Sequence, residues 1–229
     1  MKRIQNEELL NHYLIKHDIA KLFDKAILGH VQLHFYQKEE LILRAESELE
    51  YYYLLVDGKI KVSYLFENGK AMFLKFYSGF ISIGDLELFK NKPVRCNVEA
   101  IEAAYLIAVP APLLRKQYLD NVNFLHHLID SLSDKLEATI NNSSYNFIYP
   151  LVNRLASYLE EHVTDGDRVR LNASFQEIAQ FLGTTYRHLN RTLKELEAEA
   201  VIRCEGKTVH ILDQDRLRQL SKNLFLKPL

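Results

Sequence analysis

The spacing of apolar residues changes several times along the chain, and each change predicts a different kind of element. Residues 5–28 carry apolar side chains at roughly helical steps, which predicts a leading helical segment. From Val31 to Val109, short runs rich in Tyr, Phe, Ile, Leu and Val alternate with turn signals. These signals lie at residues 56–59, 67–70 and 77–79. Strands so closely spaced, without long helices between them, are typical of an antiparallel sandwich or barrel, and Pro110 and Pro112 close the region.

Residues 174–200, SFQEIAQFLGTTYRHLNRTLKELEAEA, have the pattern of a helix-turn-helix. Ser174 and Glu177 form a capping box at the first helix start, and Gly183 can adopt the positive φ of a tight turn. Thr184 and Thr185 are N-cap candidates for the second helix. On that helix an apolar face recurs at helical steps, and it consists of Leu189, Leu193, Leu196 and Ala200.

The opposite face of the second helix has side chains that can contact DNA. Arg187, Asn190, Arg191 and Lys194 share helical spacing, and Arg and Asn can reach guanine and adenine edges in a major groove. The full set of candidate DNA contacts is Thr185, Tyr186, Arg187, His188, Asn190, Arg191, Lys194 and Lys207. A helical hairpin with a merely solvated charged face is the alternative, but the first two turns of this face lack the acids expected there.

Residues 201–212, VIRCEGKTVHIL, predict a small hairpin directly after the second helix. Glu205 and Gly206 are expected to form its turn. The arrangement is a winged helix-turn-helix, and Lys207 is placed to meet a DNA phosphate.

Residues 113–148 contain a heptad-like series that predicts a long helix. Its members, spaced alternately three and four residues apart, are Val122, Leu125, Ile129, Leu132, Leu136 and Thr139. The helix can pack on its own β domain, or the first five residues of this series, here called the seam, can form a homodimer interface. A helix-turn-helix protein usually meets a two-fold operator as a dimer, which favours the homodimer.

The composition limits the class of protein. The 229 residues carry a formal net charge of −1, so any affinity for double-stranded DNA must come from locally placed cations. No apolar stretch has the length of a signal peptide core or a membrane span, so we expect no membrane partner. The two cysteines, Cys96 and Cys204, fall in different predicted domains, which fits a reducing cytoplasm.

An amino-terminal β domain, a central helix and a carboxy-terminal winged helix-turn-helix together resemble the CRP/FNR family of bacterial transcription regulators. The text from Gln176 to Ile211 resembles the family's DNA-binding segment without a gap, and the YRHL text at residues 186–189 resembles a YeiL-like branch. The resemblance implies an α+β chain whose β domain is a cyclic-nucleotide-binding-like β-roll. It also implies a homodimer that binds DNA, responds to a small effector and, as an activator, contacts RNA polymerase. The predicted domains are residues 1–112 (β-roll with leading helices), 113–149 (dimerisation helix) and 150–229 (winged helix-turn-helix).

The resemblance also identifies a candidate effector cassette, with departures from the family pattern. The candidate residues are Gly84, Asp85, Leu86, Arg95, Cys96 and Thr139. Asp85 stands where cyclic-AMP responders have a glutamate, and Cys96 is a weaker donor than the usual hydroxyl residue. Glu39 and Glu46 replace two glycines of the family's early turns. Two hypotheses stay open, an effector that is not securely a cyclic nucleotide and a vestigial pocket without an effector. No other cofactor is expected.

Two further functional hypotheses are alternatives to a non-catalytic, effector-responsive regulator. A cupin-like metalloenzyme would need converging ligands, but the β region offers only His30 and His34 and no H-x-H pair, so we expect no catalytic or metal site. A redox role for Cys96 would use Arg95 to lower its pKa, although an unpaired cysteine is more often a small buried hydrophobe.

Overall fold

A computed structural model of the chain describes residues 1–66, 71–171 and 173–221. It divides into two compact units, residues 1–135 and 136–229. The turn expected at residues 67–70 lies outside the described residues.

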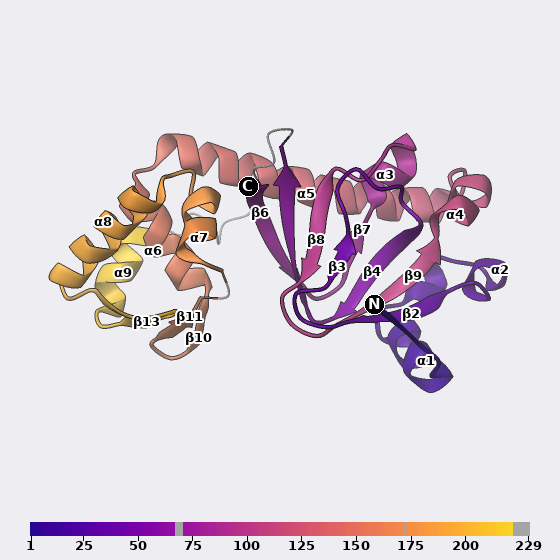
Figure 1. The fold of residues 1–229 in the computed structure, drawn as a ribbon, viewed down its shortest axis with the longest axis horizontal. Helices are drawn as coiled ribbons and strands as arrows, with labels where there is room; N and C mark the ends of the chain where they lie inside the picture. Colours follow the sequence, from indigo (N-terminus) through magenta and orange to yellow (C-terminus); the bar gives the residue numbers. More distant parts are fainter. Residues whose placement is uncertain (67–70, 172, 222–229) are drawn as a thin grey trace. The chain divides into compact units, whose positions relative to one another are not determined.

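The first unit is built on two antiparallel sheets (Figure 1). Their strand orders are β1-β2-β9-β4-β7 and β3-β8-β5-β6. The strands are β1 (Lys2–Ile4), β2 (Gln32–Tyr36), β3 (Leu41–Leu43), β4 (Tyr51–Asp57), β5 (Lys59–Leu65), β6 (Ala71–Ser78), β7 (Ile81–Ile83), β8 (Cys96–Ala100) and β9 (Ala104–Pro110). Buried side chains of both sheets, such as Leu106 and Ile60, form one core. The predicted antiparallel β-roll is confirmed.

The helices of the first unit differ from the prediction at the amino terminus. The helical elements are α1 (Glu7–Lys16), η1 (Ile19–Lys21), α2 (Lys25–Leu28), α3 (Asp85–Lys90), α4 (Ala111–Gln117) and α5 (Val122–Ile148), the last of which continues into the second unit. The continuous helical segment predicted for residues 5–28 is wrong, because Asp18 adopts a φ of 53° and separates α1 from η1. Strand β1, which pairs with β2, was not predicted.

Two turns of the β-roll hold glutamates in a backbone conformation that favours glycine. Glu39 has a φ of 70° and Glu46 a φ of 67°. A left-handed conformation costs a residue with a Cβ roughly 1–2 kcal/mol. The positions where the resemblance expects glycine thus keep a glycine-type backbone although the residue has changed.

A buried histidine lies among tyrosines in the first sheet. His34 is 1% exposed, its Nε2 lies 3.1 Å from Gln32 Oε1, and its Nδ1 lies 3.4 Å from Tyr53 Oη. Burial, and then the charge of Arg3, lowers the pKa of His34 to about 4. His34 is therefore a neutral, hydrogen-bonded core residue near neutral pH.

We expect this histidine to make the β-roll sensitive to acid. The unfolded chain binds a proton at His34 near pH 6.5 and the folded chain near pH 4, so stability falls as the pH is lowered between these values, by up to about 3 kcal/mol. Urea unfolding at pH 7 and pH 4.5 measures the loss, and His34→Gln should reduce it. His30→Gln, at an exposed position, is the control. An unchanged pH dependence in His34→Gln would exclude this cause.

The second unit is a helical domain with a four-stranded sheet of order β10-β11-β13-β12. Its elements are α6 (Leu151–Glu161), β10 (Val163–Asp165), β11 (Arg168–Arg170), α7 (Phe175–Phe181), α8 (Tyr186–Ala198), β12 (Ile202–Glu205), β13 (Thr208–Ile211) and α9 (Gln214–Ser221). The predicted hairpin is present, but its turn is Gly206–Lys207, because Glu205 pairs with Thr208. Strands β10 and β11, which extend the wing sheet, were not predicted.

Helix α5 has two apolar faces. Phe124 and Leu128 are buried in the core of the first unit, so the helix does pack on its own β domain. On another face, Val122, Ile129 and Leu136 are 63%, 58% and 61% exposed. Leu125 and Leu132 are half-buried beside them. One face of α5 therefore packs on its own β domain, and the homodimer interface along the other face stays a prediction.

Candidate functional site

Local hydrogen bonds fix the two helices of the candidate DNA interface. Ser174 Oγ accepts from the Glu177 backbone N–H at 3.2 Å, and Glu177 Oε2 accepts from Ser174 N–H at 2.8 Å. Gly183 has a φ of 59° after α7. Thr185 Oγ1 accepts from His188 N–H at 3.2 Å and caps α8, whereas Thr184 Oγ1 lies 3.3 Å from His188 Nδ1. The predicted capping box, glycine turn and Thr185 cap are confirmed.

Helix α8 separates a core face from a solvent face. Leu189, Leu193 and Leu196 are buried as expected. Ala200 was expected to join them, but it is exposed with a φ of 54° and lies beyond the helix end. Of the candidate contacts in this segment, Asn190 is half-buried, and those that are exposed are Thr185, Tyr186, Arg187, His188, Arg191 and Lys194.

One of the exposed arginines has an acidic neighbour on the same helix. Arg191 Nε lies 3.6 Å from Glu195 Oε1, and both side chains are more than half exposed. Such surface pairs contribute at most about 1 kcal/mol, so the guanidinium can exchange this partner for a base edge.

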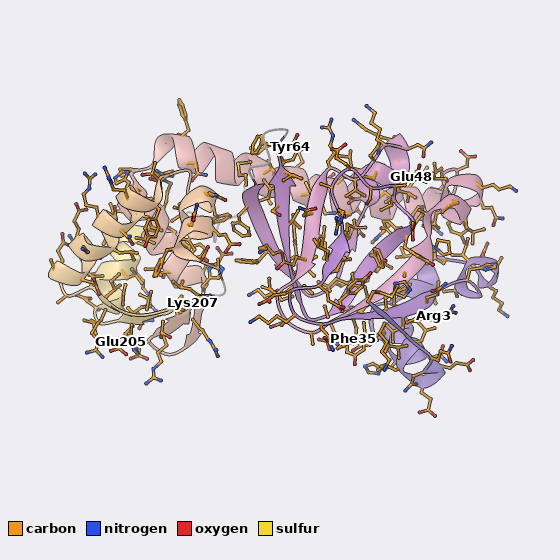
Figure 2. All side chains as sticks on the ribbon, in the orientation of Figure 1. Arg3, Phe35, Glu48, Tyr64, Glu205 and Lys207 are labelled. Carbon is orange, nitrogen blue, oxygen red and sulfur yellow. The ribbon has the colours of Figure 1, made fainter. Side chains whose placement is uncertain are left out.

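The wing adds two exposed cations at one end of its sheet. Lys207 lies in the β12–β13 turn, and its carbonyl accepts from Leu171 N–H at 2.8 Å. Arg170 of β11 is exposed and pairs in register with Thr208, the residue after Lys207 (Figure 2 labels Lys207 on the wing). Sequence reasoning missed Arg170 because it missed β11, and the alternating RVR text of residues 168–170 was the only signal.

The acid of the candidate effector cassette has partners within the chain. Gly84, with a φ of 90°, precedes α3, and a Cβ there would lie 2.7 Å from Leu49 Cδ1. Asp85 is 5% exposed. Its Oδ2 accepts from Lys135 Nζ at 2.5 Å and from Ser131 Oγ at 3.0 Å. Lys135 Nζ also donates to the Ser82 carbonyl at 2.8 Å, so this ion pair ties α5 to the cassette.

The arginine of the cassette lines a different space. Arg95 is exposed, and its backbone N–H donates to Glu87 Oε1 at 3.2 Å. It lines a shallow pocket of about 80 Å³ whose other walls are Leu86, Glu87, Lys90, Lys92 and Pro93. Asp85 does not line this pocket. The cassette residues grouped by the sequence are therefore divided, with Asp85 turned to α5 and Leu86 and Arg95 at the cationic pocket.

The last two cassette candidates do not add a reactive group. Burial, and then Glu87, raises the pKa of the Cys96 thiol to about 11, against a smaller lowering by Arg95. The redox hypothesis required a lowered pKa, so it is wrong in its premise. Thr139 is exposed on the part of α5 that belongs to the second unit, and its role as an effector contact stays a prediction.

Two other kinds of feature are absent from the described residues. These residues contain no group of three or more His, Cys, Asp or Glu side chains that could hold a metal ion. Among the same residues, no helix combines the length and apolarity needed to cross a membrane.

Comparisons with known proteins agree with these two units. A family model described as a cyclic nucleotide-binding domain matches residues 33–121, and one described as a Crp-like helix-turn-helix domain matches residues 153–220. The chain is 26% identical over 189 residues to the cAMP-activated global transcriptional regulator CRP of Pasteurella multocida, covering 80% of this chain and 90% of that protein. It is 28% identical over 156 residues to the regulatory protein YeiL of Escherichia coli O157:H7, covering 68% and 69%.

A solved structure shows the same fold over most of the chain. The crystal structure of a CRP/FNR-family transcriptional regulator from Eubacterium rectale, described as putative, superposes with a TM-score of 0.76 at 17% identity, covering 93% of this chain and 99% of that one. The fold and the matched domains define a DNA-binding transcription regulator with a cyclic-nucleotide-binding-like domain. The chain belongs to the CRP/FNR family.

Proposed function

We propose that this regulator binds a two-fold DNA site as a homodimer and reads base edges with Arg187 and Arg191 of α8. The observation that carries the proposal is the division of α8 into a buried leucine face and an exposed face with both arginines. Arginines one helical turn apart can reach neighbouring base pairs in a major groove. Lys207 and Arg170 contact phosphates, which position the protein without reading sequence.

The dimer forms along the seam face of α5. Val122, Ile129 and Leu136 repeat at heptad spacing and stay more than half exposed in the single chain. A second copy of the same helix buries them, as in a two-helix coiled coil. If the protein activates transcription, family membership implies RNA polymerase as a further partner.

We propose further that the β-roll does not bind cyclic AMP. Relatives named as cAMP-activated share the fold, but in this chain the Lys135 ammonium and the Ser131 hydroxyl already occupy one oxygen of the Asp85 carboxylate. A ribose hydroxyl would have to displace a charge-assisted hydrogen bond to reach this oxygen. In a second candidate function the β-roll binds an effector of another kind, because Lys90, Lys92 and Arg95 line a pocket suited to a small anion.

Isothermal titration of the purified protein with cyclic AMP should therefore show no binding at micromolar protein concentration. The same protein should also show no thermal shift with cyclic AMP, whereas a bound ligand at a hundred times its Kd would add about 2.7 kcal/mol. Inorganic phosphate and pyrophosphate in parallel scans test the second candidate, with Arg95→Ala as the variant that removes a pocket cation. Tight cyclic AMP binding would contradict the proposal that Lys135 and Ser131 keep the ligand from the Asp85 carboxylate.

Removing the wing cation should weaken DNA binding without changing its specificity. Lys207→Ala is expected to lower affinity by a similar factor for all sequences and to reduce the slope of log K against log salt by about one unit per chain, because one counterion fewer is released. Arg170→Ala should act in the same way. Fluorescence anisotropy at several salt concentrations measures both, and Lys38→Ala, an exposed change in the β-roll, is the control. A change in sequence preference would show that the wing reads bases.

A further inference from the structure

The turn of the helix-turn-helix is bonded to two helices that precede it. Asn146 Nδ2, near the end of α5, donates to the Phe181 carbonyl at 3.1 Å. Arg154 Nη1, in α6, donates to the Leu182 carbonyl and, at 3.0 Å, to Asn146 Oδ1. We call Asn146 and Arg154, with these two carbonyls, the polar clamp. All four residues belong to the second unit.

The arginine of the polar clamp is buried in an unusual setting. Arg154 is 7% exposed, and no acidic side chain of the described residues pairs with it. Burial lowers the pKa of its guanidinium. A buried cation is costly unless polar groups surround it, and here the partners are a backbone carbonyl and an amide oxygen rather than a carboxylate. Its Nε has no hydrogen-bond partner in the described chain, so the hydrogen bonds given for this guanidinium are those that Nη1 donates within the clamp.

The glycine of the turn brings the backbone close to the same asparagine. A Cβ on Gly183 would lie 3.1 Å from Asn146 Cγ and 3.3 Å from its Nδ2. The close approach leaves little room for the turn to move relative to the end of α5. The turn between α7 and α8 is therefore held both by hydrogen bonds and by packing.

We propose that Asn146 and Arg154 are positioning residues for DNA recognition, which hold the helix-turn-helix against the end of α5. Within the second unit, the direction of the end of α5 then sets the direction of α8, and so, in the proposed dimer, the geometry with which two recognition helices meet two half-sites. This inference rests on the proposed dimeric DNA binding. Pro150 lies between α5 and α6, where a proline can act as a hinge between two helices. The polar clamp joins Asn146, before that proline, to Arg154, after it, so Pro150 lies inside a bonded segment.

A comparison of single and paired half-sites tests the proposal. Binding-site selection with the wild type supplies the operator, from which duplexes with one half-site and with both are made. Asn146→Ala and Arg154→Met should bind the single half-site within twofold of the wild type and the paired duplex at least tenfold more weakly, because only paired binding depends on the relative geometry of two readers. Arg154→Lys, which keeps a cationic donor, should recover most of the loss. Glu161→Ala, exposed on α6, is the matched control.

The possible results separate the hypotheses. Equal loss on single and paired duplexes, or a fall in the thermal unfolding temperature that accounts for the loss, would assign the polar clamp a structural role only and overturn the proposal. Unchanged paired binding in both variants would overturn it as well. A wild type that binds no duplex would instead contradict the proposed function itself.

Discussion

Ile129→Asp should convert the protein from a dimer to a monomer. In the single chain Ile129 is 58% exposed, so an aspartate there meets water and leaves the fold intact. In the dimer each chain would bury an unpaired carboxylate in the seam between Val122 and Leu136, and each such charge costs several kcal/mol. Two carboxylates near the symmetry axis also repel each other. Both effects oppose association of the two chains.

Sedimentation equilibrium at micromolar concentration measures the change. The wild type should sediment as a dimer and Ile129→Asp as a monomer with an unchanged circular dichroism spectrum. Asn123→Asp places the same charge on an exposed position of α5 outside the seam and should stay dimeric. A monomeric wild type under these conditions would remove the basis for interpreting the exposed stripe as an interface.

The elements that could be predicted are those with local signals. The capping box of Ser174 and Glu177 and the leucine spacing of α8 each depend on residues a few positions apart, and the structure has both. The glycine-type turns at Glu39 and Glu46 could be located only through resemblance, because glutamate itself carries no signal for a positive φ.

The features that could not be predicted depend on contacts between residues far apart in the sequence. The Asp85–Lys135 ion pair joins positions 50 residues apart, and nothing in either local sequence indicates the other. Strands β10 and β11 have three residues each, too few for an alternation to stand out. The break at Asp18 arises because the tertiary packing of Ile19 overrides a helical spacing that otherwise continues.

Loss of either recognition arginine should have the largest effect on DNA binding. A base-reading arginine contributes about 1–3 kcal/mol per half-site, so a dimer that lacks it at both half-sites loses about 2–6 kcal/mol. Arg187→Ala and Arg191→Ala should also relax preference at one position each, because the guanine contact disappears. The Arg191→Ala variant also loses the surface ion pair with Glu195, which changes the stability of the protein little because both side chains are exposed. Arg44→Ala, exposed in the β-roll, should leave affinity unchanged.

Binding-site selection from random duplex DNA, run with the wild type and with each arginine variant, shows directly whether α8 recognises the DNA sequence. The wild type should recover a palindromic sequence whose half-sites lie about 34–36 Å apart or a multiple of that distance. Each variant should lose preference at one position in each half-site. Two results would show that α8 does not recognise the DNA sequence. In one, the wild type enriches no sequence; in the other, both variants enrich the wild-type sequence with unchanged affinity.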